Sequence, residues 1–192
     1  MTFVRHLGIG RLAALLVLPL LAACASSDAK IYTLTAEGGG RVAGRPVSIS
    51  IETVDVAKYL DRPQLVRRSS SVQLNVSEFE RWGEPFGSMV QRVLAENLRL
   101  RLPAGSLVTT SQTVTGKEAS TLEVSVNRFD LDDTGMVVLQ AQWRLHYRTG
   151  ASGAAAQANI SVRPAGSDTA AQIQAMSQAL DQLAARVAQR LG

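Results

Sequence analysis

A single cysteine, Cys24, stands at the end of an apolar N-terminal stretch, and this limits what the rest of the chain can fold into. Because one cysteine cannot form an intrachain disulfide, the residues that follow have to be held together by a hydrophobic core. They are numerous enough for one domain of ordinary size. We therefore expect one compact domain after Cys24.

The first 23 residues have the organisation of a signal peptide. A segment with two arginines precedes an apolar core from Leu12 to Leu21. The apolar stretch stops at Cys24 and is shorter than the ~20 residues that a membrane-spanning helix needs. We expect residues 1–23 to be removed.

The segment Leu21-Ala22-Ala23-Cys24 resembles a lipobox, the signal at which lipoprotein signal peptidase cuts after diacylglycerol is attached to the cysteine. We expect Cys24 to be the lipid attachment site. The alternative is an ordinary secretory signal with an incidental cysteine, which would leave a reactive thiol exposed. Residues 24–30 then form the acylated cysteine and a polar tether that reaches at most roughly 20–25 Å.

The charge of the mature chain gives no sign of a nucleic-acid partner. Removing residues 1–23 takes away two of the 20 basic residues and none of the 16 acidic ones, which leaves a formal net charge of +2. No dense run of Lys and Arg remains that could follow a phosphate backbone.

Alternating and helical periodicities predict the elements of the domain, residues 31–192. Strands are expected near 31–35, 47–51, 72–76, 122–131, 137–147 and 156–162, and helices from Pro85 to Pro103 and from Asp168 to the end. A change of phase between Val126 and Phe129 indicates a β-bulge. The fold class is α+β: a single domain with a mixed, mostly antiparallel sheet and two long helices packed on one face.

The mature chain holds few residues suited to catalysis. Its one histidine, His146, lies in a strand between two arginines, with no nearby acidic residue to orient it as a base. Asp130 and Asp132 resemble the start of a calcium loop, but the twelfth position is Ala141 instead of glutamate, which favours a simple turn. We expect no enzyme activity, no cofactor and no metal.

Two clusters stand out. The first is Tyr59-Leu60-Asp61-Arg62-Pro63-Gln64, followed by Leu65 and Val66. A loop stiffened by proline binds a partner at a lower ordering cost, so these six residues are candidate partner-binding residues. In the alternative interpretation the segment is a packed connector with Tyr59 and Leu60 in the core.

The second cluster is Arg81-Trp82-Gly83-Glu84-Pro85-Phe86. We interpret it as a structural motif, with Arg81, Trp82, Glu84 and Pro85 as its main residues. Trp82 and Phe86 would fix the start of the first helix against the sheet, and Glu84 would lie where the helix dipole favours a negative charge.

These clusters, with Tyr32-Thr33-Leu34 ahead of them and behind a lipobox, resemble the ABC-type transport auxiliary lipoprotein family, the PqiC-like (paraquat-inducible) group. The resemblance spans nearly the whole mature chain, although the part after Gly105 adds little specificity. Gly83 stands where the family usually has alanine.

The resemblance implies transport and not catalysis. Family members are lipoprotein subunits of systems that pair an inner-membrane component with a ring or tube protein of the MCE (mammalian cell entry) class, which carries lipids between two membranes. This chain would be the adaptor at the outer-membrane end, and several copies would gather on a symmetric tube. The residue after the cysteine is Ala25 and not aspartate, which favours the outer membrane over the inner one.

Two other functions are left open by the residues. The domain could be a lipid-binding module that holds an acyl chain between sheet and helices, near Met89, Val93, Met176 and Leu180. It could also be a structural lipoprotein that assists outer-membrane assembly.

Overall fold

The computed structural model describes residues 28–110, 119–147 and 152–191. The predicted signal peptide, Cys24 and the first part of the tether lie outside the described residues. The strands are β1 (Lys30–Tyr32), β2 (Ser48–Ile51), β3 (Asp55–Val56), β4 (Gln64–Arg68), β5 (Leu74–Trp82), β6 (Leu107–Thr109), β7 (Ser120–Leu131), β8 (Val137–His146) and β9 (Ser152–Val162). The helices are α2 (Phe86–Arg101) and α4 (Thr169–Leu191).

All these strands belong to one sheet, in which β7 is the central strand. Along one edge β7 forms a long antiparallel ladder with β8, which pairs in turn with β9. Along the other edge it makes short parallel pairings with β2, β3 and β4. The sheet is therefore mixed and mostly antiparallel, as the sequence predicts.

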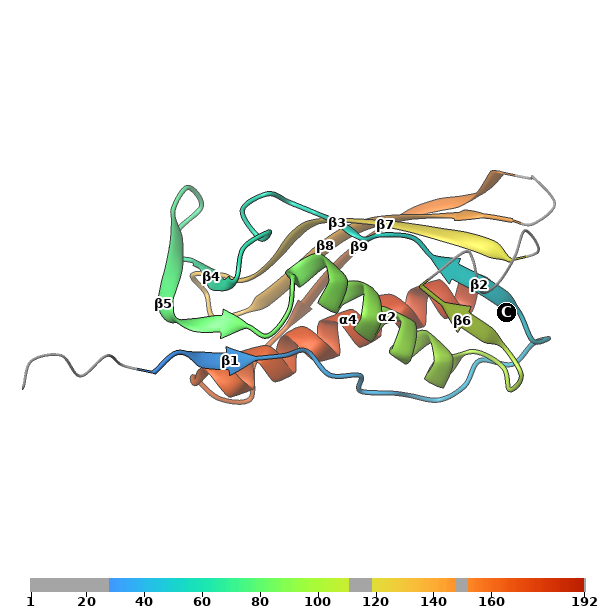
Figure 1. Cartoon of the computed structure of the whole chain (residues 1–192), viewed down its shortest axis with the longest axis horizontal. Helices are drawn as coiled ribbons and strands as arrows, with labels where there is room; N and C mark the ends of the chain where they lie inside the picture. Colours follow the sequence, from blue (N-terminus) through green and yellow to red (C-terminus); the bar gives the residue numbers. More distant parts are fainter. Residues whose placement is uncertain (1–27, 111–118, 148–151, 192) are drawn as a thin grey trace, which may run out of the picture.

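The two helices lie beside each other on one face of this sheet (Figure 1). Strand β8 shows why that face is apolar, because Leu139, Trp143 and Leu145 are buried while Gln142 and Arg144 alternate with them and are exposed. The helices close the core with stripes that are 6% exposed or less: Met89, Val90, Val93, Leu94 and Leu98 on α2, and Ile173, Met176, Leu180, Leu183 and Val187 on α4.

Two local predictions are confirmed. The register between β7 and β8 shifts between Val126 and Arg128, where the sequence changes phase. Asp168 caps α4, since its Oδ1 accepts a hydrogen bond of 2.9 Å from the backbone N–H of Ala171.

The hairpin of β4 and β5 differs from expectation. Gln64 to Val66 do not continue the loop but begin β4, and Leu65 and Val66 are both buried. The β4–β5 register shifts between Gln64 and Val66. The tip of the hairpin stands out from the body, at the same end as β1 (Figure 1).

Candidate functional site

The two clusters singled out in the sequence meet in space. Strands β4 and β5 pair antiparallel with Gln64 opposite Arg81. The backbone N–H of Trp82 donates a hydrogen bond of 2.7 Å to the carbonyl oxygen of Pro63. This pairing places residues 61–63 beside residues 82–86.

The segment Tyr32-Thr33-Leu34, which also carries the family resemblance, lies beside these two clusters. Strand β1 pairs parallel with the end of β5, with Tyr32 opposite Trp82. The N–H of Gly83 donates a hydrogen bond of 2.9 Å to the carbonyl oxygen of Tyr32. Three segments that are separate in the sequence therefore form one contiguous region.

At this junction lies a surface pocket of about 340 Å³. It is lined by Asp61, Arg62, Pro63, Trp82, Gly83, Glu84, Pro85 and Phe86. Trp82 and Phe86 are almost fully buried, and their ring centroids are 5.1 Å apart. Phe86 also packs on Phe129 of β7, at 5.8 Å. The pocket thus has an aromatic base that the core holds in place.

The second cluster, residues 81–86, links the end of β5 to the start of α2. Pro85 immediately precedes α2, and its carbonyl oxygen accepts a hydrogen bond of 3.0 Å from the N–H of Met89. Arg81 and Trp82 belong to β5, and the ring of Trp82 packs on Phe86 at the start of α2.

Charged side chains surround the pocket. Glu84 forms an ion pair with Arg92 of α2. The guanidinium of Arg92 also lies 3.4 Å from the carboxylate of Glu96. Asp61 and Arg62 are exposed, and within the described residues neither forms an ion pair. Their charges are therefore available to a partner.

A second pocket, of about 390 Å³, adjoins the first. The two pockets share Asp61 and Pro85, and the second one continues past the start of α2 to Lys58 and Ser88. We refer to the residues that line these two pockets as the α2 entrance surface.

The first part of the Tyr59 cluster is structural. Leu60 is buried, and the hydroxyl of Tyr59 donates a hydrogen bond of 2.7 Å to Oδ2 of Asp130. That fully buried carboxylate also pairs with Arg128 at 2.9 Å and with Arg68 at 3.4 Å. Burial, with the hydrogen bond and the charge of Asp130, raises the pKa of Tyr59 to about 12.

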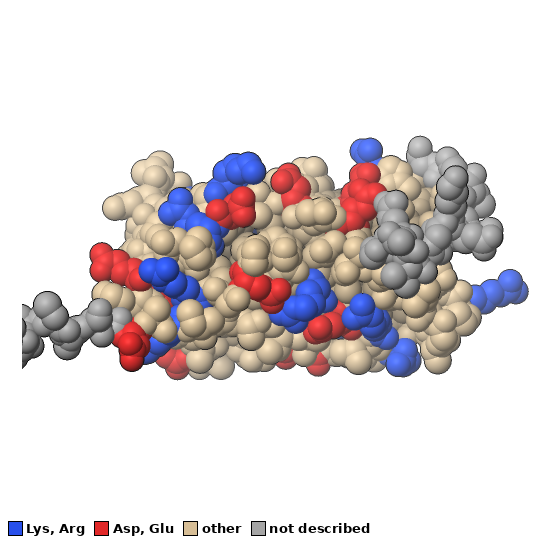
Figure 2. Space-filling model, in the orientation of Figure 1, with Lys and Arg blue, Asp and Glu red and all other residues tan. Residues whose placement is uncertain are grey.

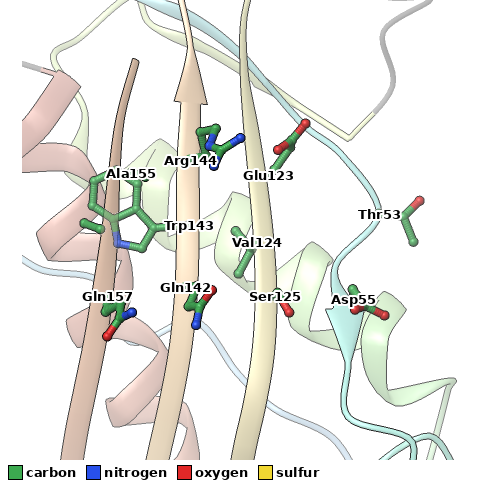
Figure 3. A pocket seen from close by; sticks show the side chains of 11 residues that line it. Thr53, Asp55, Glu123, Val124, Ser125, Gln142, Trp143, Arg144, Ala155 and Gln157 are labelled. Atoms are coloured by element: carbon green, nitrogen blue, oxygen red, sulfur yellow. The ribbon is translucent and has the colours of Figure 1, made fainter. Parts of the chain in front are cut away.

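The largest of the described pockets, about 500 Å³, lies on the face of the sheet that faces away from the helices (Figure 3). Strand alternation lines it mainly with polar side chains, among them Gln142 and Gln157. Figure 3 shows Glu123 and Arg144 side by side on β7 and β8. This pocket contains no residue of the three converging segments.

His146 has an acidic neighbour that the sequence did not reveal, because the neighbour comes from the adjacent strand. Its Nε2 lies 3.0 Å from Oε1 of Glu123, and both side chains are about half exposed. An exposed pair of this kind stabilises the fold only slightly.

The calcium-like segment is a turn, as expected. Oδ1 of Asp132 accepts hydrogen bonds from the N–H groups of Thr134 (3.0 Å) and Met136 (2.9 Å). Among residues 28–110, 119–147 and 152–191, no three His, Cys, Asp or Glu side chains are grouped as a metal site.

The side chains considered for lipid binding are core residues. Met89, Val93, Met176 and Leu180 are each 2% exposed or less and pack in the hydrophobic core that the two helices share with the sheet. Neither of the helices in the described ranges has the length and apolar composition needed to cross a bilayer.

Known proteins resemble this chain both in sequence and in fold. Intermembrane transport lipoprotein PqiC of Escherichia coli (strain K12) is 29% identical over 98 residues, which make up 51% of each chain, and the protein of that name from Shigella flexneri matches equally. This chain thus spans about half the length of these curated relatives.

Two solved structures share the fold. Protein XCC0632 from Xanthomonas campestris superposes with a TM-score of 0.66 at 20% identity, over 82% of this chain and 92% of that one. A crystal structure titled only as an uncharacterized protein gives 0.76 at 22% identity, over 86% and 100%. The family model described as "ABC-type transport auxiliary lipoprotein component" matches residues 32–188. The chain therefore belongs to the ABC-type transport auxiliary lipoprotein family.

Proposed function

We propose that this protein is a periplasmic lipoprotein, anchored through Cys24 to the outer membrane, that acts as an adaptor at that end of an MCE-type lipid conduit. The α2 entrance surface would bind the ring or tube protein, whose inner-membrane component lies at the other end. Several copies bound to a symmetric tube would form a homo-oligomer. The adaptor role involves no catalytic step in this protein, and the tube protein and its inner-membrane component would carry out the transport.

The observation that supports this role is one exposed pocket that residues 61–63 and 82–86 line together, with Tyr32 of a third segment paired to Trp82 beside it. The pocket has a rigid aromatic base and an exposed charged rim, which is the composition of an interface hot spot. Its walls are held by the hydrogen bond between Trp82 and Pro63, so a partner meets a site that is already formed and pays little ordering entropy. A relative that carries the name of an intermembrane transport lipoprotein agrees with this role.

The structure also decides which residues a test should change. Replacing Tyr59 or Leu60 would damage the core, because one is bonded to the buried Asp130 and the other is itself buried. Asp61 and Arg62 are exposed and can be changed without loss of packing. Reversing both charges, Asp61→Lys with Arg62→Glu, tests the rim alone.

The test is co-purification of the acylated protein with the MCE-class protein of the same organism. We expect the double reversal to reduce recovery of the complex about tenfold or more, as loss of interface charge pairs does. Arg163→Glu with Asp133→Lys is the matched control, since both residues are exposed and lie outside the α2 entrance surface. Unchanged recovery with the double reversal would reject this surface as the contact.

The anchor is tested separately. Intact-mass analysis of membrane-extracted protein should show loss of residues 1–23 and added acyl chains, and membrane fractionation should place it with the outer membrane. A free thiol at Cys24 would refute the anchor. Neighbouring genes for a tube protein and an inner-membrane component would favour the adaptor over an assembly lipoprotein.

A further inference from the structure

We propose that the tip and outer flank of the β4–β5 hairpin form a second membrane contact, which rests on the lipid surface beside the acyl anchor. This inference rests on the proposed anchoring at Cys24. It concerns a part of the molecule that the α2 entrance surface does not include.

The hairpin carries exposed apolar side chains at one end of the molecule. Val72 at its tip is 92% exposed, Phe79 on β5 is 48% exposed, and Ile31 on the neighbouring β1 is 62% exposed. Val76 adds another partly exposed apolar side chain. Large apolar groups in this exposed state favour burial against another apolar phase.

The outer part of the hairpin is also uncharged. Residues 69–77 contain no Asp, Glu, Lys or Arg. Figure 2 shows the tip as a projection without acidic or basic side chains, whereas the rest of this face carries both. Entry of residues 69–77 into a headgroup layer therefore costs no desolvation of a charge.

The path of the chain indicates that the apolar phase is a lipid bilayer. Lys30 pairs with Glu80 of β5, so the described chain begins beside the hairpin. Cys24 precedes Lys30 by only six residues, a span of at most roughly 20 Å. An acyl group on Cys24 would therefore keep this end of the domain close to the membrane.

The hairpin is fixed firmly to the body. Arg67 of β4 donates hydrogen bonds of 2.7 Å to Glu80, 2.7 Å to Gln172 and 2.9 Å to Thr169. These bonds tie the end of β4 that leads into the hairpin turn to β5 and to the first turns of α4. A contact at the tip therefore orients the whole domain relative to the membrane.

The exposed charges on β5, Glu78 and Arg81, have opposite signs. The contact should depend on apolar burial and respond weakly to salt. The hairpin should insert equally well into a neutral phosphatidylcholine bilayer and into one that contains the anionic lipid phosphatidylglycerol.

The experiment uses the full acylated chain in vesicles of each composition. Acylation consumes the only native thiol, so Val72→Cys or Phe79→Cys provides one site for an environment-sensitive dye. Leu107→Cys is the matched control, because Leu107 is 46% exposed and belongs to β6, at the opposite end of the molecule (Figure 1). We expect blue-shifted emission at positions 72 and 79, with about half of it quenched by phospholipids that carry a spin label just below the headgroup. We expect neither effect at position 107.

Flotation of the same vesicles separates the two proposals. If all variants float but positions 72 and 79 behave like position 107, the anchor stands and the hairpin contact is wrong. If no variant floats, the anchor fails and the hairpin contact fails with it. A response at 72 and 79 that arises only after addition of the MCE-class protein would identify a protein contact and overturn the lipid one.

Discussion

Arg101, in the last turn of α2, forms a two-point ion pair with Asp181 in the middle of α4. Nε and Nη2 of the guanidinium lie 2.8 and 2.5 Å from the two carboxylate oxygens, and both side chains are less than one fifth exposed. The pair joins the two helices at the edge of the core. Planar guanidinium and carboxylate groups fit each other in this way, which lysine cannot reproduce.

Asp181→Asn should lower the free energy of unfolding by about 1–3 kcal/mol, because it leaves the guanidinium partly buried without its counter-charge. Urea denaturation measures the change. Glu96→Gln is the matched control, since its pair with Arg92 is more exposed and should contribute less than about 1 kcal/mol. Equal effects of the two variants would contradict the role given to the helix pair.

Ionisation of Tyr59 should lower the free energy of unfolding as pH rises into the alkaline range. Its pKa is raised from 10.0 to about 12, so the unfolded chain loses the phenolic proton first as pH rises. The full stabilisation is present below pH 10 and is lost between pH 10 and 12. Tyr59→Phe should be less stable at neutral pH but should lose less stability across that window, which thermal melts at a series of pH values measure. If the melting temperatures of the native protein and of Tyr59→Phe fell in parallel between pH 10 and 12, the raised pKa of Tyr59 would be refuted.

Two glycines near the pocket should differ in their tolerance of alanine. A Cβ on Gly83 would lie 3.3 Å from Cγ2 of Ile31, a side-chain end that can move. A Cβ on Gly87 would lie 3.1 Å from the carbonyl oxygen of Val54, which is backbone. Neither glycine has a positive φ angle.

Gly83→Ala should therefore leave stability unchanged or raise it by up to about 1 kcal/mol, since alanine reduces the freedom of the unfolded chain. Gly87→Ala should lower stability by about 1 kcal/mol or more, because the first turn of α2 has to move away from Val54. Denaturant midpoints compare the two, and a Gly87→Ala protein as stable as Gly83→Ala would disprove the close contact.

Arg67→Ala should loosen the hairpin without unfolding the core. It removes three hydrogen bonds between β4, β5 and the start of α4. Hydrogen exchange followed by mass spectrometry should show faster exchange in peptides from β4 and β5 and little change in β8. Arg67→Lys should not restore slow exchange, because an ammonium cannot reproduce the fork of donors. Uniformly faster exchange would show that the whole fold depends on Arg67.

The same cluster makes the hairpin sensitive to acid. Burial alone would raise the pKa of Glu80, but hydrogen bonds from Arg67 and Thr169 outweigh it, and the net pKa lies below the ordinary value of 4.5. The carboxylate therefore stabilises the folded state above pH 4.5, and this contribution is lost as pH falls further. The protection of β5 amides, measured as exchange corrected for the pH dependence of the intrinsic rate, should fall there in the native protein, whereas the protection in Glu80→Gln should show little acid dependence. Identical acid responses would rule out Glu80 as the group responsible.

Several features could be predicted because they depend on neighbours in the sequence. The bulge after Val126 follows from a change of phase within one strand, and the cap at Asp168 follows from a side chain three residues away from its donor. The apolar stripe of α4 likewise follows from helical spacing. Periodicity and the capping preference of aspartate, both read from local sequence, are sufficient for these features.

Other features depend on residues that are distant in the sequence. The sequence does not predict β4, because the consecutive residues Leu65 and Val66 are both buried. No alternation of apolar and polar residues therefore marks this strand. Ser50 alternates with Ile49 and Ile51, a pattern that predicts an exposed polar position, yet its side chain is only 2% exposed. The pocket between Pro63 and Trp82 could not be derived, because it depends on how the hairpin pairs.

The parallel pairing of β1 with β5 gives the domain a mechanical property. A force applied at the N-terminal end acts along β1 and shears its three residue pairs with β5 together, instead of peeling them apart one by one. In the residues that follow β1 in the sequence, the N–H of Leu34 donates a hydrogen bond of 3.3 Å to Sδ of Met89 on α2. The N–H of Thr35 donates one of 3.1 Å to Oγ of Ser177 on α4. Tension at this end is thus shared between the sheet and both helices, and the domain can be held from one point without its strands being unzipped.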